Sequence, residues 1–379
     1  MKIPFHDLTR QNRPFEQQYR SALTAAISDG NFILGEAVAE FEKKLSRFAG
    51  LGVSTAVGSG TDALYLALEA LKRRPGSDKK KYVVTTPMSY IASTSSIYLS
   101  GLTPIFCDVD ESMNLCPKEV EGVLQNRDDI LAVLLVHLGG IPAAMTSHSY
   151  LRSQYSIPVV EDCAQAFGTQ YAGVSVGALC DFGAFSFHPL KVFSALGDAG
   201  VLAALEPDDV EFLRLARNHG HITRDNVQFF SHNMRMDAIQ ARFLSLKMEA
   251  VDDLLVQRNA QVEAYKSRLT PLLAEGILNL PKVPKKATRI SYNFFMIKAP
   301  ERASLQKHMA KMGVETKVHY ERLLPDLNAT KNLESVKVGS LPNAQKAAKE
   351  IISLPLGCHL EFPMIEYICE TITNYYRGN

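Results

Sequence analysis

The sequence predicts an α/β protein built on a mostly parallel sheet, because short apolar runs alternate with longer helical ones over the first half of the chain. The apolar runs are continuous, which is typical of strands that are buried on both faces. The strand candidates are residues 53–57, 82–86, 104–107, 131–136 and 157–160. The helix candidates between them are residues 61–73, 90–99, 118–125 and 143–154.

The second half of the chain has a different pattern, in which helical runs dominate. The helix candidates are residues 208–217, 236–248, 250–273, 304–312, 344–351 and 364–376, and the strand candidates are 292–298 and 314–318. A chain of 379 residues is long enough for about two or three structural units. We therefore predict a large α/β domain over residues 1–250 and a smaller α+β domain over residues 251–379.

The composition excludes several classes of protein. The chain is 46% hydrophobic and 21% charged, with a net charge of +1, which argues against wholesale disorder and against a globally basic nucleic-acid-binding surface. Six cysteines without a C-x-x-C pair indicate neither a disulfide framework nor a zinc ribbon. No signal-peptide pattern opens the chain, and the longest apolar run, residues 130–138, is too short to span a bilayer. We expect a cytoplasmic protein without a nucleic-acid or membrane partner.

A glycine-rich turn over residues 58–63 matches G-x-G-x-x-A between a predicted strand and a predicted helix. Such a turn suits a phosphate, because backbone N–H groups and the helix N-terminus favour an anion. A nicotinamide dinucleotide site would also need an acid at the end of the next strand, but residues 85–87 are Thr-Thr-Pro. A nicotinamide-dependent oxidoreductase therefore stays an alternative with weaker support.

Two residues that carry chemistry follow predicted strands. Asp162 comes at the end of a buried strand, where open α/β sheets bind ligands, and Lys191 follows the apolar strand 182–187. The bland alternatives are a helix N-cap for the aspartate and a surface position for the lysine. Together with the phosphate turn, however, they are what pyridoxal phosphate needs: an anion site, a partner for the ring nitrogen and an amine for the aldehyde.

Three other patterns are better explained without a function. The G-x-S-x-G match at residues 173–177 precedes a strand and not a helix, so we expect a hairpin instead of a nucleophile elbow. His219 and His221 have no further ligands at metal spacing, and no metal is expected. The basic run 72–81 is predicted to be a solvated loop.

The order of motifs resembles the DegT/StrS family of pyridoxal-phosphate aminotransferases, which act on nucleotide-linked keto-sugars. The matching stretches span nearly the whole chain and are NFILGEAVAEFE at Asn31, GSGTDAL at Gly58, TPMSYIAS at Thr86, PIFCDVD at Pro104, VHLGGIPAAM at Val136, EDCAQAFG at Glu161, SFHPLK at Ser186, GDAG at Gly197, RNHG at Arg217, HNMRMDAIQA at His232, VHY at Val318 and SLPL at Ser353. The resemblance implies the type I aminotransferase fold and a homodimer whose active sites are shared between subunits.

The resemblance also assigns roles around the cofactor ring. It implies that Lys191 binds the cofactor aldehyde and moves the proton during the reaction, and that Asp162 is the partner of the pyridine nitrogen. Tyr90 lies where the family places an aromatic residue that stacks on the ring. Gln165 occupies the position that contacts the ring face or its O3′.

The phosphate and the sugar have their own expected contacts. Gly60, Thr61, Asp62 and Ser186 fall at the phosphate site of the family, and Asn233 resembles an asparagine that reaches the phosphate from the neighbouring subunit. The residues expected to border the sugar are His319 and Tyr320. Three positions depart from the common family pattern, namely Ala199, Met234 and Glu321. None of the three removes a catalytic group.

The expected reaction is transfer of an amino group from an amino acid, with glutamate favoured, to a nucleotide-linked keto-deoxysugar. The family's sugar dehydratases carry histidine where this chain has Lys191, which argues against that branch. The GTDAL and NFILG stretches are more similar to members that act on 3-keto sugars. A 4-keto sugar, a cyclitol ketone and a non-catalytic regulatory role remain alternatives.

Overall fold

The computed structural model describes residues 1–337 and 339–378. Its centre is an eight-stranded sheet with the order β1-β9-β8-β5-β4-β2-β3-β14. The pairings from β14 to β8 are parallel, whereas β8–β9 and β9–β1 are antiparallel. The strands are β1 (Val53–Val57), β2 (Tyr82–Thr85), β3 (Thr103–Phe106), β4 (Ile130–Val136), β5 (Val159–Asp162), β8 (Phe182–Ser186), β9 (Gly200–Ala204) and β14 (Val336–Lys337). The predicted α/β fold with a mostly parallel sheet is confirmed.

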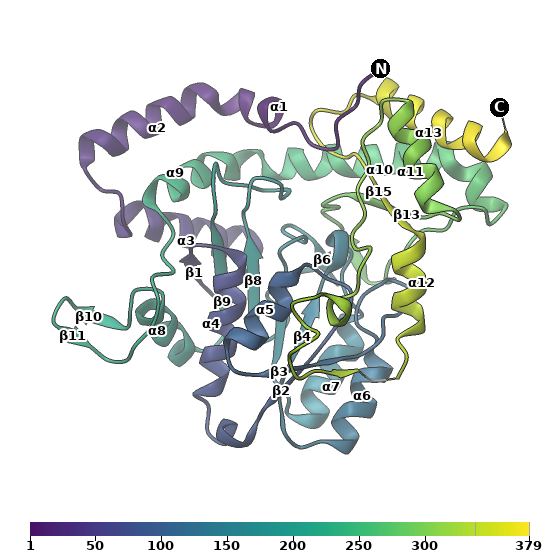
Figure 1. Cartoon of the computed structure of the whole chain (residues 1–379). Helices are drawn as coiled ribbons and strands as arrows, with labels where there is room; N and C mark the ends of the chain where they lie inside the picture. Colours follow the sequence, from purple (N-terminus) through teal and green to yellow (C-terminus); the bar gives the residue numbers. More distant parts are fainter. Residues whose placement is uncertain (338, 379) are drawn as a thin grey trace.

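Helices cover both faces of this sheet (Figure 1). They are α3 (Gly35–Ala49), α4 (Gly60–Lys72), α5 (Ile91–Leu99), α6 (Pro117–Asn126), α7 (Met145–Tyr155), α8 (Pro207–Ala216) and α9 (Ala238–Lys247). Every residue of β4 is buried, as its unbroken apolar sequence predicts. The sequence analysis missed β9, whose glycine and alanines make a weak strand signal, although all of its residues are buried.

The C-terminal part packs a small antiparallel pair, β13 (Phe295–Lys298) with β15 (Ile351–Leu354), against helices. The helices are α10 (Val251–Ala274), α11 (Arg302–Lys311), α12 (Pro342–Glu350) and α13 (Phe362–Arg377). The strand predicted at 314–318 is wrong. Val314 makes one bridge to Ile3 and Lys317 makes one to Ser353, so the segment's pairing is divided between two different neighbours.

The N-terminal segment packs with the C-terminal part. Ile3 and Phe5 belong to the same buried cluster as residues of α10, α11 and α13. The backbone of Ile3 also exchanges hydrogen bonds with Gly313 and Glu315. The division at residue 250 stays a prediction, but the first residues of the chain lie beside the far end of the sequence (Figure 1).

Two peripheral elements project from this body. The N-terminal helices α1 (Leu8–Asn12) and α2 (Glu16–Asp29) lie along one side of the molecule, and the hairpin β10 (His221–Thr223) and β11 (Asn226–Val227) extends away from α8 (Figure 1). Their exposed apolar side chains include Leu23, Ile27, Ile222, Val227 and Phe230.

The short elements complete the chain. They are the hairpin β6 (Gln170–Tyr171) and β7 (Val174–Ser175), the strand β12 (Ala287–Arg289) paired with β6, and the 3-10 turns at Arg13–Phe15, Ser77–Lys79, Leu138–Gly140, Met248–Ala250 and Leu324–Asp326. Within the described residues, no helix combines the length and the apolar character needed to cross a membrane.

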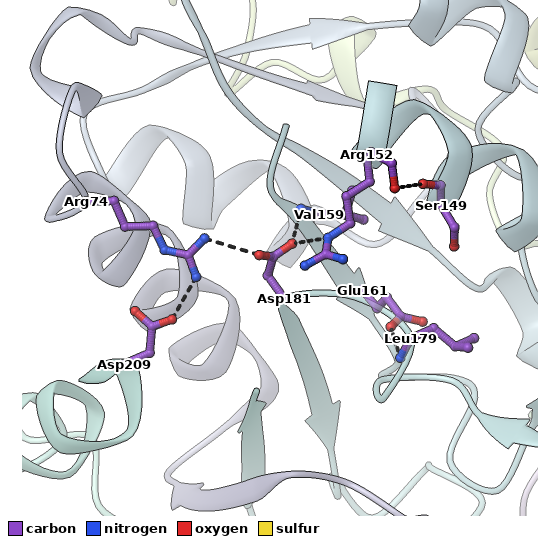
Figure 2. Close-up of polar contacts among 9 residues, drawn as sticks. Arg74, Ser149, Arg152, Val159, Glu161, Leu179, Asp181 and Asp209 are labelled. Atoms are coloured by element: carbon purple, nitrogen blue, oxygen red, sulfur yellow. Dashed lines mark hydrogen bonds and ion pairs between the residues drawn. The ribbon is translucent and has the colours of Figure 1, made fainter. Parts of the chain in front are cut away.

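An ion-pair network lies at the amino-terminal ends of β5 and β8 (Figure 2). Asp181 accepts hydrogen bonds from Arg152 Nε at 2.8 Å, from Arg74 Nη1 at 3.1 Å and from the backbone N–H of Val159 at 3.0 Å. Arg74 also donates to Asp209 at 2.7 Å. Although burial opposes ionisation, these donors hold the pKa of Asp181 below its ordinary value.

Candidate active site

A cavity of about 370 Å³ opens at the carboxyl ends of the parallel strands. Most of the predicted site residues line it: Gly60, Thr61, Tyr90, Asp162, Gln165, Ser186, Lys191, His319 and Tyr320. They come from the start of α4, the ends of β5 and β8, and the loop after α11. The structure therefore brings together residues that the sequence separates by up to about 260 positions.

Asp162 is the last residue of β5 and is 5% exposed. Its Oδ2 accepts a hydrogen bond from Ser93 Oγ at 2.8 Å, and its Oδ1 accepts one from the backbone N–H of Ala164 at 3.1 Å. Burial raises its pKa, although the two hydrogen bonds and the charge of the nearby Lys191 act in the opposite direction. This carboxylate is thus held in a fixed orientation and can still accept a cationic partner from the cavity.

Lys191 lies in the loop between β8 and β9, and its backbone N–H donates to His188 at 2.9 Å. Among the described residues, its ammonium group makes no hydrogen bond or ion pair that would occupy it. Burial lowers the pKa of this lysine, while the nearby Asp162 acts in the opposite direction. A lysine amine with a lowered pKa is more often neutral, which is the form that attacks a carbonyl.

The predicted phosphate turn packs closely against the end of β8 and the start of β9. Ser59 caps α4 by accepting a hydrogen bond from the N–H of Asp62 at 3.1 Å. A Cβ added at Gly60 would lie 2.7 Å from the Cβ of Ser186, and one added at Gly200 would lie 2.4 Å from the carbonyl carbon of Ser59. Only glycine fits at these two positions, and the helix N-terminus opens into the cavity.

A hydrogen-bonded chain forms another wall of the cavity. Gln165 accepts from the N–H of Gly139 at 2.6 Å and donates to the Tyr320 hydroxyl at 3.0 Å. The ring of Tyr320 lies 6.5 Å from that of Tyr90, centroid to centroid. Because its amide is bonded on both sides, Gln165 presents a fixed side chain to the cavity.

His319 is stacked on Phe294 with ring centroids 3.9 Å apart, and its Nδ1 lies 2.9 Å from Ser353 Oγ. Burial lowers its pKa to about 3, and the nearby Lys191 adds to this effect. The imidazole is therefore neutral, with Nε2 left for a ligand.

Two predicted phosphate residues do not line the cavity of their own chain. Asp62 contributes its N–H to the Ser59 cap, and its carboxylate lies near Gly58. Asn233 is exposed beside the β10–β11 hairpin, and its Oδ1 accepts from Arg235 Nε at 2.8 Å. That bond leaves the amide NH₂ of Asn233 free to donate to an anion.

The sequence analysis missed several residues of the cavity. Ser59 lies inside the motif that was recognised, and its capping role follows from its place before a helix. Ser93, the last residue of the TPMSYIAS stretch, does not line the cavity itself but supports Asp162 from α5. His6 also lines the cavity, and nothing in the sequence indicates that the N-terminal segment reaches this site.

Of the patterns judged non-functional, the basic run 72–81 differs in part from the predicted solvated loop, because α4 continues to Lys72 and Arg74 pairs with Asp181 and Asp209. The G-x-S-x-G match lies in the β6–β7 hairpin. Among the described residues, the metal-ligand grouping that stands out is not the His219 and His221 pair but His137, Glu161 and Cys163, all buried. His137 Nδ1 accepts from the N–H of Ala143, so its Nε2 donates to Glu161 at 3.1 Å, and this pair is already hydrogen-bonded.

The cavity fits pyridoxal phosphate. Among the described residues, Lys191 makes no hydrogen bond through its amine, and Asp162 is a buried carboxylate hydrogen-bonded only to uncharged groups. The turn at Gly60 adds a helix N-terminus at which any side chain beyond hydrogen would clash with Ser186. The fold and this set of groups together define a pyridoxal-phosphate-dependent aminotransferase.

The chain belongs to the DegT/DnrJ/EryC1/StrS aminotransferase family, whose model matches residues 15–373. It is 31% identical to a pleiotropic regulatory protein of Geobacillus stearothermophilus over 100% of this chain and 99% of the relative. It is 30% identical to dTDP-3-amino-3,4,6-trideoxy-alpha-D-glucose transaminase of Streptomyces venezuelae over 99% of this chain and 96% of that protein. The crystal structure of S. venezuelae DesV in complex with a ketimine intermediate superposes with a TM-score of 0.92 at 30% identity, over 99% and 98% of the two chains.

Proposed function

We propose that this aminotransferase transfers an amino group from glutamate to a nucleotide-linked 3-keto deoxysugar. The observation that carries the proposal is the cavity in which Lys191, Asp162 and the Gly60 turn meet. The Streptomyces relative supports the 3-position, because its name describes a 3-amino sugar product. A 4-keto sugar and a cyclitol ketone are the alternatives that the experiment below separates.

The residues divide the chemical work. When bound, pyridoxal phosphate supplies an electron sink that stabilises negative charge at the substrate carbon. Asp162 keeps a proton on the ring nitrogen, Lys191 accepts and returns the proton at the substrate carbon, and the N–H groups of Gly60 and Thr61 bind the phosphate. Tyr90 would cover the cofactor ring, and Tyr320 with Gln165 fixes one side of the cavity.

We propose further that the working enzyme is a homodimer with shared sites. The described cavity residues include one lysine and no arginine, although the cofactor and the sugar nucleotide both carry phosphates. Asn233 lies on an exposed segment with a free NH₂, next to a hairpin with exposed apolar side chains. A partner's Asn233 would complete the phosphate site and bury that apolar surface.

We propose a cytoplasmic location because the cysteines are not paired in disulfides. Cys107, Cys116, Cys163, Cys180, Cys358 and Cys369 are all free thiols. Free thiols are typical of proteins in a reducing compartment.

A regulatory role is the second candidate, because the relative from Geobacillus carries a regulatory name. The intact Lys191 and Asp162 favour catalysis, since a purely regulatory protein has no need of an unpaired lysine beside a buried carboxylate.

The test is a half-reaction followed by a full one. Purified protein loaded with pyridoxal phosphate should be yellow, and glutamate should bleach the colour and release 2-oxoglutarate. The bleached protein is then offered nucleotide-linked 3-keto and 4-keto sugars, and mass spectrometry reports which gains an amine. A protein that stays yellow with glutamate and with other amino acids would contradict the proposal and favour the regulatory role.

The shared site has its own test. Lys191→Ala and Asn233→Ala are each expected to be inactive as homodimers, and mixed subunits should regain about a quarter of wild-type turnover, because a heterodimer contains one intact site. No recovery in mixtures that demonstrably exchange subunits would contradict the shared site.

A further inference from the structure

The N-terminal segment over residues 3–6, called the strap below, delivers one side chain into the active-site cavity. Ile3 donates to Gly313 at 2.8 Å and accepts from the N–H of Glu315 at 2.9 Å. The N–H of Phe5 donates to Glu315 Oε2 at 3.0 Å. Ile3 and Phe5 are fully buried, and the next residue, His6, lines the cavity.

The strap is held from the other side as well. His359 Nε2 lies 3.1 Å from the carbonyl oxygen of Pro4. Asp7, directly after His6, caps helix α1 by accepting from the N–H of Arg10 at 2.9 Å. Because the backbone on both sides of His6 is fixed, its imidazole has a preorganised position before any ligand binds.

The imidazole of His6 is available to a ligand. Among the described residues, neither of its ring nitrogens makes a hydrogen bond, and its ring rests edge-on against Phe5 with centroids 4.7 Å apart. Burial lowers its pKa to about 4, with Arg258, His359 and Lys317 adding to the effect and Glu315 opposing it. At neutral pH the ring is therefore uncharged, with one nitrogen that donates and one that accepts.

His6 lines the same cavity as the ionisable side chains of His319 and Lys191. Phe5 lies 6.0 Å from the His319 ring, so the strap and the His319 loop meet at the cavity wall. Lys191, His319 and His6 line one cavity, so a sugar whose ketone lies at Lys191 shares that cavity with both histidines.

We propose that His6 is a specificity-determining residue that hydrogen-bonds a hydroxyl group of the sugar ring near the reacting ketone. The inference rests on the proposed sugar aminotransferase function and deepens it. A neutral imidazole suits a hydroxyl, which both donates and accepts, better than the carboxylates of an amino-acid donor. His6 therefore acts in the half-reaction with the sugar and not in the one with glutamate.

The test compares His6→Ala and His6→Asn with the wild-type holoenzyme. The probes are glutamate and a dTDP-linked 3-keto-6-deoxyhexose, with its 4-deoxy analogue as a substrate that lacks a hydroxyl next to the ketone. His308→Ala, in a histidine of α11 outside the cavity, is the matched control. Glutamate bleaching measures the first half-reaction, and amine gain measures the second.

His6→Ala should lower kcat/KM for the hydroxylated sugar by about 5- to 10-fold, the range for one uncharged hydrogen bond, and leave glutamate bleaching within about twofold. His6→Asn should recover part of the loss, because an amide also donates and accepts. Discrimination between the hydroxylated and deoxy sugars should fall in His6→Ala and stay unchanged in His308→Ala.

Two results would overturn the inference: equal losses for glutamate and sugar, which would indicate a structural or donor-binding role, or unchanged sugar kinetics in His6→Ala. If wild-type protein is not bleached by glutamate, the proposed function itself fails. These failures are distinguishable because the first half-reaction is measured separately.

Discussion

The two ends of strands β5 and β8 carry buried carboxylates with opposite electrostatic surroundings. At the amino ends, Asp181 is bonded by Arg152 and Arg74, and its pKa is lowered (Figure 2). At the carboxyl ends, Asp162 is bonded by a hydroxyl and a backbone N–H, and burial raises its pKa. The first arrangement satisfies a charge within the chain, whereas the second leaves a carboxylate that is hydrogen-bonded only to uncharged groups and can accept a cation from a ligand.

Substitution of the reacting lysine should have the largest effect. Lys191→Ala removes both the covalent anchor and the proton acceptor, so we expect turnover to fall by about 10³-fold or more and the yellow colour to be lost. The measurement is 2-oxoglutarate formation with glutamate. Lys285→Ala, at an exposed lysine, is the control and should behave like wild type.

Substitution of Asp162 should lower activity much more than substitution of Asp181. Asp162→Asn keeps the shape but loses the charge that holds the ring proton, so kcat should fall by about 10²-fold, as for a lost charged hydrogen bond. Asp181→Asn should leave the kcat of the folded protein near the wild-type value, because its contacts lie at the opposite end of the strands. Equal activity losses in both variants would contradict the contrast.

For stability the order should be reversed, with Asp181→Asn more destabilising than Asp162→Asn. Asp181→Asn leaves Arg74 and Arg152 without their shared counter-charge, which we expect to cost about 2–4 kcal/mol in free energy of unfolding, reduced from the fully buried range because both arginines are partly exposed. Asp129→Asn is the matched control. It breaks the more exposed pair with Arg127 and should cost about 0–1 kcal/mol by urea unfolding.

The pH dependence should follow the opposite pKa shifts. The stabilising contribution of Asp181 is present above its unfolded pKa of about 3.9 and is lost as the pH falls through its lowered folded pKa, so Asp181→Asn and wild type should converge in strong acid. Asp162 has a raised pKa, so the cofactor-free protein is penalised as the pH rises through it. Thermal unfolding of both variants at pH 7 and pH 3 checks the two slopes.

The smallest expected effect is a gain in the stability of the cofactor-free protein. In the cofactor-free protein at pH 7, Asp162→Asn removes a buried charge whose burial outweighs the opposing charge of the nearby Lys191. The free energy of unfolding should therefore rise by about 1 kcal/mol, or roughly 2 °C in Tm. Cofactor binding should reverse the order, because the ring proton then pairs with the wild-type carboxylate. Destabilisation of the cofactor-free variant would show that Asp162 is structural.

The sequence predicted that Asp162 and Lys191 lie at one site because each residue follows an apolar strand, and both line the same cavity. Asp162 lies two residues after the strand predicted at 157–160 and is the last residue of β5. Lys191 follows the strand predicted at 182–187. The glycine turn was found because its motif is local. The strand predicted at 314–318 was wrong because its apolar pattern pairs with two different segments, which a local pattern does not encode.

The sequence by itself determined the fold class and indicated the glycine turn, Asp162 and Lys191 as candidates for one site, because strand periodicity and turn chemistry depend on neighbouring residues. Only the tertiary structure decided which distant groups surround them. It placed Ser93 on Asp162, His6 in the cavity that His319 also lines, and two arginines on Asp181. Whether a buried carboxylate is neutralised within the chain or left for a ligand depends on contacts across the fold, and that choice separates the structural end of the sheet from the chemical one.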